Sequence, residues 1–420
     1  MNPDGAGGPV YSGPFAGPEG GMDPGAAGGP AGSAPNPAVA PEVLLARAYL
    51  SRVAEPPAPA LARFVAGLGP VEAAARVARG AVPDAVARET SARRTVDRAR
   101  ADLDAAAACG VRLLTPEHEQ WPHWPFAAFA VAGKDELAPP LALWVRGPGA
   151  LADLCEQSIA VVGARAATDY GMHMAGELAR GAGDHGFTVV SGAAIGIDGA
   201  AHRGALAVEG PTVAALACGP DRAYPMAHEV LLERIAERGL VVSEYPPGSV
   251  PGRHRFLVRN RLIAGMAGGT VVVEAGLRSG AQRTASDARA LGRPLMAVPG
   301  AVTNGLSAGC HRLIREGAQL VTRIEEVLES AGRIGFHLAE DPVAGPARPT
   351  DGLSAAAAAV HDALPARAAR ETGWISREAA VPIGAVRAAM VDLERRGLVE
   401  HRDGRWRRRP VPADEGCGGA

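Results

Sequence analysis

The sequence predicts an α/β fold centred on a doubly wound, Rossmann-like parallel sheet, with a small helical N-terminal domain and a C-terminal winged-helix domain. The main evidence is a series of short, valine-rich runs between residues 158 and about 325, each followed by a glycine or turn residue and then a helical pattern. Continuous apolar strands alternating with helices are typical of a parallel sheet covered on both faces. Right-handed crossovers then favour a doubly wound arrangement.

The N-terminal part of the chain divides into three segments. Residues 1–40 consist largely of Gly, Pro and Ala and are predicted to be a disordered tail, because they bury too little apolar surface to offset the entropy of ordering. Residues 41–110 carry short helical patterns, which fit either a helical domain of helix-hairpin (SAM-like) type or a plain helical cap on the next domain. Residues 111–150 resemble an extended connector, so the sheet domain is predicted to span 111–330.

The C-terminal part is predicted to be a separate small domain. Residues 331–352 resemble a Pro/Gly linker, and 410–420 form a tail. Between them, 353–409 give a short helix, a turn, a second helix over 383–396 and two strand-like segments around Asp403-Gly404, which is the pattern of a winged helix. The second helix is expected to turn Val386, Met390 and Leu393 inward.

Composition excludes several classes of protein. The formal net charge of −2 means that any nucleic-acid contact must come from local patches. Lys134 is the only lysine and precedes an aspartate, so a P-loop ATPase is excluded. The five scattered cysteines lack a CxxC pair, which argues against a zinc site or disulfide framework and favours a reducing cytoplasm. With no leader and no long apolar run, we expect a cytoplasmic protein without a membrane segment.

Candidate ligand contacts follow the strands, where ligands of open parallel sheets bind. Arg165 follows the first strand in a loop that lacks the GxGxxG fingerprint; it either holds a phosphate or covers the sheet edge. Ser191, Gly192 and Gly196 form a flexible loop before a helix start. In that helix, Asp198 and His202 are either a catalytic pair or, as we favour, a helix cap and a structural histidine.

The stretch RHRFLVRNR, residues 253–261, holds four arginines and a histidine without an acid. Arg253, Arg259 and Arg261, with Asn260, could hold phosphates, and Phe256 offers a ring on which a base could stack. The alternative is a solvated helix start. We expect Arg259 and Arg261 to face phosphates at the mouth of the sheet.

The last candidate loop follows the strand GTVVVEA. Glu274 ends this strand, where burial would raise its pKa unless Arg278 or Arg283 pairs with it. Ser279 and Gly280 precede the next helix in an arrangement that suits anions. No nucleophile–base arrangement, metal-ligand cluster or cofactor motif is evident, so we predict a non-catalytic binding protein with no cofactor and no metal.

These motifs, taken in order, resemble the DNA-processing protein A family (DprA, also called Smf) over residues 111 to about 325. The resembling segments are AVVGARAATDYG, VVSGAAIGIDGAAHRGAL, GPDRAYPMAHEVLLERIAERG, VVSEYPPGSVPGRHRFLVRNRLIAGMA, VVVEAGLRSGAQRTASDARALGRPLMAVPG and NGLSAGCHRLIREGA. The resemblance implies a Rossmann-like protein that binds single-stranded DNA, forms a homodimer and loads the RecA recombinase, protecting incoming DNA in naturally transformable (competent) bacteria. It places the DNA pocket at Arg165, the Ser191–Gly196 loop, Arg259, Asn260, Arg261, Ser279 and Gly280.

The chain departs from the family pattern at three places. The usual LARGID is AAIGID here, GTN is replaced at Gly309-Cys310-His311, and Arg283 stands where an apolar residue is common. Two other functions stay open. One is a phosphoribohydrolase-like enzyme using Glu274, which the segment AGGTVVVEAG suggests; the other is a duplex-DNA regulator led by the arginine-rich winged helix, which could equally be a protein docking module.

Overall fold

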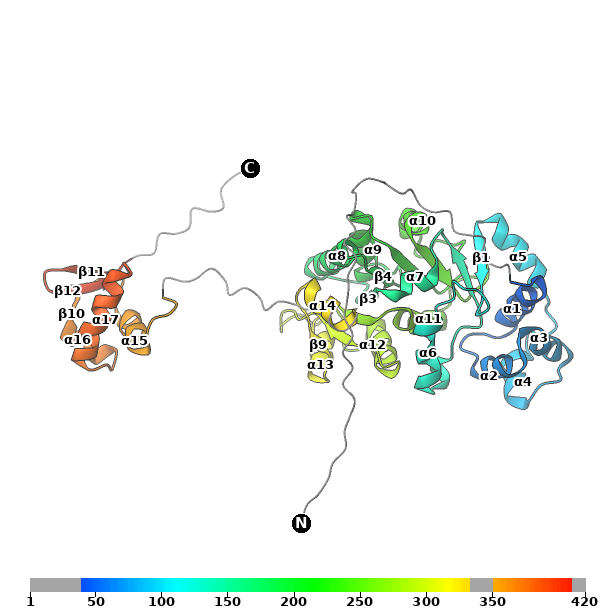
Figure 1. Cartoon of the computed structure of the whole chain (residues 1–420), viewed down its shortest axis with the longest axis horizontal. Helices are drawn as coiled ribbons and strands as arrows, with labels where there is room; N and C mark the ends of the chain where they lie inside the picture. Colours follow the sequence, from blue (N-terminus) through cyan, green and yellow to red (C-terminus); the bar gives the residue numbers. More distant parts are fainter. Residues whose placement is uncertain (1–38, 333–349, 410–420) are drawn as a thin grey trace, which may run out of the picture. The chain divides into compact units, whose positions relative to one another are not determined.

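The computed structural model describes residues 39–332 and 350–409, in two compact units divided near residue 339. The predicted linker over 331–352 and both predicted tails, 1–40 and 410–420, lie almost wholly outside the described residues. Figure 1 labels the helices and strands of both units, and each unit has a hydrophobic core of its own. The two units are therefore described separately.

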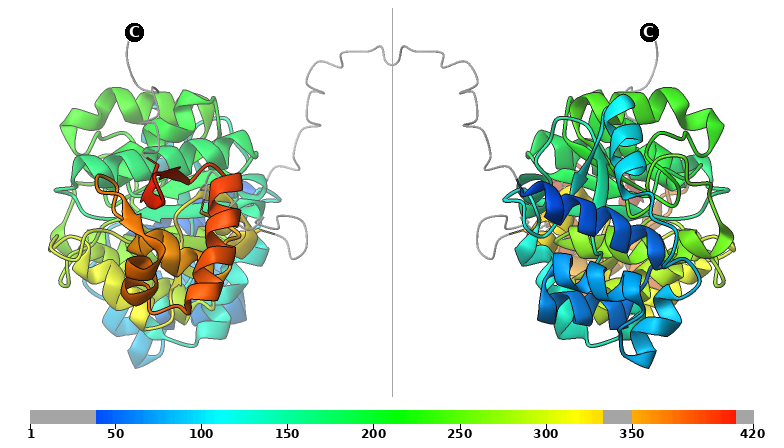
Figure 2. Two further views of the ribbon diagram at one scale, coloured as in Figure 1. Left: turned by 90° about the vertical axis from the view of Figure 1, so that its left-hand side faces the viewer. Right: turned by 90° about the vertical axis from the view of Figure 1, so that its right-hand side faces the viewer.

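The first unit begins with five helices. Prolines open the first three, where a missing N–H costs no hydrogen bond and φ is already helical. Their apolar faces bury Leu50, Leu61 and Val77 in a cluster that also contains Trp144 of the sheet. The right-hand view of Figure 2 looks directly onto these helices, coloured blue to cyan, which lie together on one side of the unit. They are α1 (Pro41–Val53), α2 (Pro59–Leu68), α3 (Pro70–Arg79), α4 (Asp84–Thr90) and α5 (Ala99–Ala108).

The sheet has nine strands in the order β1-β2-β6-β5-β4-β3-β7-β8-β9. Strands β3 to β9 are all parallel, which confirms the mainly parallel α/β sheet, whereas β1 and β2 extend it in antiparallel pairing through β6. The strands are β1 (Val111–Leu114), β2 (Leu143–Arg146), β3 (Ser158–Val162), β4 (Thr188–Ser191), β5 (Thr212–Leu216), β6 (Leu240–Ser243), β7 (Gly269–Val272), β8 (Leu295–Ala297) and β9 (Gln319–Leu320).

Helices cover both faces of this sheet. Alternate residues of β3 enter two different clusters: Ala160 and Val162 pack with α6, α7 and α11–α13, and Ile159 and Val161 pack with α8, α9 and α14. The helix α10 extends the second face beside β5 and β6. The helices are α6 (His123–Ala132), α7 (Leu151–Glu156), α8 (Asp169–Asp184), α9 (Ile197–Ala207), α10 (Glu229–Arg238), α11 (Arg253–Met266), α12 (Gly280–Ala290), α13 (Ala308–Arg315) and α14 (Ile324–Ala331), with short 3-10 turns η1 (Asp135–Leu137) and η2 (Met226–His228).

The strand order reverses at β3. The chain runs outward from β3 through β4, β5 and β6, and then returns to pair β7 with the other edge of β3. Loops on the two sides of such a reversal diverge, and they leave a crevice beyond the carboxyl ends of the strands. The loops after β3 and β7 are therefore the place to look for a ligand site.

The second unit packs three helices against a small antiparallel sheet of order β10-β12-β11. The prediction for the second helix is confirmed, since α17 buries Val386, Met390 and Leu393. Asp403 and Gly404 both have positive φ, as a tight hairpin turn between β11 and β12 requires. The elements are α15 (Ala355–Ala363), β10 (Arg370–Glu371), α16 (Thr372–Glu378), α17 (Ile383–Arg395), β11 (Val399–Arg402) and β12 (Arg405–Arg408).

Across 39–332 and 350–409, no helix is both long and apolar enough to span a bilayer.

Candidate nucleic-acid interface

A cavity of about 890 Å³ opens at the carboxyl edge of the sheet, at the strand reversal. Its walls come from the loops after β3 and β7 and from one face of α11, with contributions from the loops after β4 and β5. The predicted site residues among its lining are Arg165, Arg253, Phe256, Arg259, Asn260, Ser279 and Gly280. Residues more than one hundred positions apart in the chain are thus brought to one site.

An arginine and two aromatic side chains lie in contact at this cavity. The guanidinium of Arg165 lies 5.1 Å from the centre of the Phe256 ring, which lies 5.2 Å from that of Tyr224. Sequence reasoning missed Tyr224, whose only signal was its place in the loop after β5. A smaller cavity of about 260 Å³ shares all three side chains. The group therefore presents aromatic surface to both cavities.

Two further arginines at the cavity are exposed. Arg253 opens α11, and Arg278 lies in the loop before α12. Among the described residues, neither guanidinium has a hydrogen-bond or ion-pair partner. The sequence indicated for Arg278 only a possible pairing with Glu274. These two cations, with Arg165, are free to meet an anion.

Hydrogen bonds to β3, α9 and α11 fix the loop that follows β4. The hydroxyl of Ser191 donates to the carbonyl of Val161 over 2.6 Å, and the carboxylate of Asp198 accepts from the amide of Gly192. Arg259 donates to the carbonyl of Gly192 over 2.8 Å and to that of Ala215. A Cβ at position 192 would lie 2.6 Å from this guanidinium, which explains the glycine. Ser191 and Gly192 thus shape the loop.

The prediction that Arg259 and Arg261 face phosphates needs correction. Arg259 lines the cavity but is 4% exposed, and its Nη1 atom donates to two backbone carbonyls. Its burial lowers the pKa of the guanidinium to about 10. Arg261 is 1% exposed and makes a two-pronged ion pair with Glu244, at 2.6 and 2.7 Å, away from the cavity. A buried carboxylate more than fifteen residues upstream left no sequence signal for this pairing.

The start of α12 forms another wall of the cavity. Asn260 donates its side-chain amide to the carbonyl of Gly280 over 3.3 Å, which ties α11 to α12. Ser279 is the N-cap residue of α12, and its hydroxyl oxygen is buried without a partner in the described part of the chain. The first amides of a helix and an unused hydroxyl together suit an anion. Ser279 and Gly280 therefore line the cavity, and their contact with an anion stays a prediction.

Glu274 pairs with neither Arg278 nor Arg283, the two possible partners that the sequence offered. Its carboxylate accepts from the amide and the hydroxyl of Thr168 at 2.9 and 2.6 Å, is 1% exposed and does not line the cavity. Arg283 instead pairs with Asp287. Glu274 thus ties the loop after β3 to β7, and its burial outside the cavity lining gives the enzyme hypothesis no support.

Asp198 and His202 do not form a pair. Asp198 accepts from the loop amides, whereas the Nδ1 atom of His202 contacts the hydroxyl of Thr212 over 2.7 Å. Since that hydroxyl donates to the carbonyl of Val189, Nδ1 must carry the proton and donate. Burial lowers the pKa of His202 to about 3. Within 39–332 and 350–409, no cluster of His, Cys, Asp or Glu could hold a metal ion.

Comparison with known proteins places this chain in a family. Residues 112–332 match the family of DNA recombination-mediator protein A. The DNA processing protein DprA of Mycobacterium tuberculosis (strain H37Rv) is 52% identical over 363 residues, which cover 86% of this chain and 93% of the relative. Protein Smf of Escherichia coli K12 is 41% identical over 203 residues, covering 48% and 54% of the two chains.

A solved structure agrees with the match in sequence. The crystal structure of DNA processing protein A from Streptococcus pneumoniae superposes with a TM-score of 0.56 at 30% identity, and the alignment covers 70% of this chain and 98% of that one. The family match includes the whole of the cavity wall described above. The chain therefore belongs to the DNA recombination-mediator protein A family, the DprA/Smf family.

Proposed function

We propose that this protein binds single-stranded DNA in the cavity at the carboxyl edge of its sheet, without catalysing a reaction. The observation that carries the proposal is the combination of exposed cations and neighbouring aromatic rings at one cavity. Arg165, Arg253 and Arg278 supply charge for phosphates, and Phe256 and Tyr224 supply surfaces for bases. Stacking platforms beside cations are the usual means of binding single strands.

The same geometry favours single strands over duplex DNA. In a duplex, the bases are stacked on one another and paired, so their faces cannot reach a ring inside a cavity. The lining groups that could contact a phosphate also include the first amides of α12. A flexible strand can present a phosphate and an unstacked base to these two kinds of group together.

Family membership supports a wider role. Relatives of this chain are named as DNA processing proteins. We extend the proposal to protection of single strands and loading of RecA by a homodimer in the cytoplasm, during DNA uptake or recombination. These steps rest on the family resemblance, and the cavity supplies only the DNA-binding part.

The first test is fluorescence anisotropy of labelled oligo-dT and of a duplex of equal length, across a series of salt concentrations. The wild type should prefer oligo-dT. The double variant R253Q/R278Q should bind about tenfold more weakly at low salt, and the slope of log K against log salt should fall by roughly 1.4, since each lost phosphate contact on a single strand removes about 0.7. R234Q removes an exposed arginine of α10 outside the cavity and serves as the matched control.

Two results would contradict the assignment. Equal affinity of wild type and R253Q/R278Q for oligo-dT would show that the cavity does not bind DNA. Preference for duplex, unaffected by these substitutions, would move binding to the C-terminal unit.

That second outcome corresponds to a second candidate function, duplex binding by a C-terminal winged helix. The order of α15–α17 and the hairpin β11–β12 fits a winged helix. In the hairpin, Arg405 and Arg407 pair with Glu371 and Glu400. Arg402 has no such partner among the described residues and could contact a DNA backbone.

A further inference from the structure

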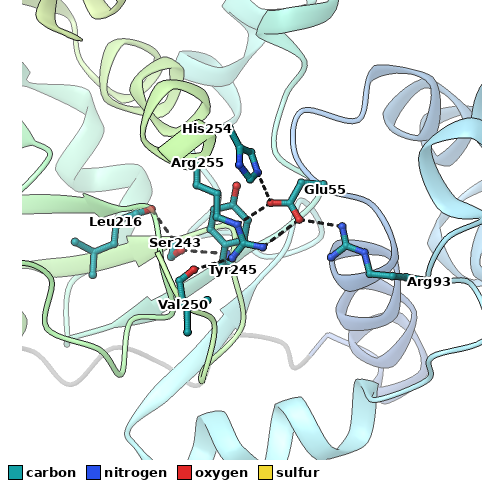
Figure 3. A network of polar contacts seen from close by, with 8 residues as sticks. All are labelled: Glu55, Arg93, Leu216, Ser243, Tyr245, Val250, His254 and Arg255. Atoms are coloured by element: carbon teal, nitrogen blue, oxygen red, sulfur yellow. Dashed lines mark hydrogen bonds and ion pairs between the residues drawn. The ribbon is translucent and has the colours of Figure 1, made fainter. Parts of the chain in front are cut away.

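A single carboxylate joins the N-terminal helices to the helix that forms the rim of the cavity. Glu55, just after α1, accepts from Nε and Nη2 of Arg255 at 2.8 and 3.1 Å and from Arg93 at 2.9 Å. The Nε2 atom of His254 lies 3.2 Å away. Figure 3 shows donors converging on Glu55 from two sides. Two hundred residues of chain separate Glu55 from Arg255.

These contacts lie on the opposite side of α11 from the cavity. Arg253, Phe256 and Leu257 line the cavity, as residues three to four apart on one helix face should. At 100° per residue, His254 and Arg255 belong to the other side of the same turn. Arg255 is held there by Glu55, by the carbonyl of Val250 and by stacking 4.2 Å over the ring of Tyr245.

The start of α11 needs an anion that its own sequence lacks. Gly252 is the N-cap residue and offers no side-chain cap, and the first turn contains no acid. That turn instead carries Arg253, His254 and Arg255, although a helix N-terminus is already partly positive. Like charges at that position oppose the first turn of the helix. Glu55 is the carboxylate that offsets them.

The pKa of Glu55 reflects this role. Partial burial acts to raise the pKa, but hydrogen bonds and charge from Arg93 and Arg255 outweigh it, so the net pKa is lowered. The carboxylate is therefore charged at neutral pH and holds its donors as an anion. Its side chain is 28% exposed, so the contact is only partly screened by solvent.

We propose that Glu55 is a positioning residue for the DNA site: it fixes the first turn of α11 from behind, so that Arg253 and Phe256 are presented to the strand. The N-terminal helices thereby act on DNA affinity without contacting DNA. This inference rests on the proposed binding of single strands in the cavity. A phosphate of the strand would then contact Arg253 on the cavity face of the first turn of α11, while Glu55 already offsets the positive charge on the opposite face.

The sign of one substitution separates positioning from simple electrostatics. Glu55→Gln removes a negative charge near a polyanion site, which by charge alone should tighten binding of DNA. If Glu55 positions the rim, the same change should weaken binding of oligo-dT, by about threefold at a temperature well below unfolding. The double variant E55Q/R255Q should bind no more weakly than R255Q, because both changes break one contact.

Glu117→Gln is the matched control. Glu117 accepts from Arg47 of α1 at 2.6 Å, so it also joins the N-terminal helices to the sheet domain, and its side chain is 31% exposed. Within the described residues, Glu117 makes no hydrogen bond or ion pair with α11. E117Q should lower thermal stability about as much as E55Q does, and its affinity for oligo-dT should match that of the wild type.

Amide hydrogen exchange of the full chain gives a readout that does not need DNA. In E55Q, the amides of residues 253–258 should exchange faster than in E117Q, since local opening becomes easier. Unchanged exchange there, equal or tighter DNA binding by E55Q, or equal weakening by E117Q would each overturn the inference. Failure of the wild type to bind oligo-dT would instead refute the proposed function, and the exchange rates would still decide whether Glu55 holds the turn.

Discussion

The four arginines of residues 253–261 are close together in sequence but lie in different environments in the fold. Arg255 and Arg261 are paired with carboxylates, Arg259 is buried and donates to backbone carbonyls, and Arg253 alone among them is exposed at the cavity without a partner in the described residues. Reversing the charge of Arg261 would place a second carboxylate beside the buried Glu244. We expect such a variant to unfold, so its loss of DNA binding would say nothing about the cavity. Useful substitutions at this site are those of its exposed cations.

Asp287 gives a prediction about pH. It is 4% exposed and pairs with Arg283 at 3.0 Å, but burial raises its pKa to about 6. An aspartate in an unfolded chain titrates near pH 3.9, so the folded protein binds the proton more tightly. This stabilising contribution is complete below about pH 4 and is lost as the pH rises through 6.

Urea unfolding of the wild type and of D287N between pH 4 and 7.5 would measure this effect. The wild type should lose roughly 2–3 kcal/mol relative to D287N as the pH rises. Substitution of Asp184, an exposed aspartate of α8, should leave the pH dependence unchanged. Parallel curves for the wild type and D287N would show that Asp287 does not titrate in this window.

At the scale of elements, three loops form the cavity wall as one structure. The amide of Ile197 donates to the carbonyl of Ala164, and the amide of Ala164 donates to the carbonyl of Glu274. The loops after β3, β4 and β7 are thereby bonded to one another. Gly196 makes this possible, because its φ is +86° and a Cβ there would lie 2.4 Å from the carbonyl oxygen of Ala164.

Gly196→Ala should therefore lower the free energy of unfolding by about 2 kcal/mol and weaken binding of oligo-dT. The comparison is Gly176→Ala in α8, where a Cβ meets nothing within 4 Å. That change should raise stability by about 0.5–1 kcal/mol, as alanine for glycine does inside a helix. Denaturant unfolding and anisotropy measure both effects, and equal behaviour of the two variants would contradict the role given to Gly196.

At the scale of the whole molecule, the chain consists of two units with separate cores. The cluster of the second unit contains Val360, Ile375, Leu393 and Leu398 and no residue of the first unit. Among the described residues, the cavity proposed to bind DNA is lined by residues of the first unit alone. Folding and DNA binding should therefore be separable between them.

A fragment of residues 340–420 should fold alone, with a single cooperative thermal transition by circular dichroism. A domain of this size has a small core, so its stability should be only a few kcal/mol. The chain without these residues should keep the wild-type affinity for oligo-dT. A fragment without helical signal, or a truncated chain that no longer binds, would show that the units depend on each other.

Much of the fold was predictable because its signals are local. The valine-rich runs became β3 to β8, and the inward residues of α17 followed from helical periodicity. The order of loop motifs also sufficed to predict the family, and Arg165, Phe256, Ser279 and Gly280 meet at one cavity as expected. The antiparallel pairing of β1 and β2 has no such local signal, because it depends on which strand edge was free.

The sequence by itself determined the strand and helix pattern, the separation of a small C-terminal unit and the loops that line the cavity. Only the tertiary structure decided which charges are free. It pairs the buried Arg261 with Glu244 and directs Arg259 to backbone carbonyls. It leaves Arg278 exposed at the cavity and places Glu55 on the opposite side of α11. The physical reason is that periodicity reports which residues are buried along one element. Pairing between charges depends on distances across the fold, which no local pattern records.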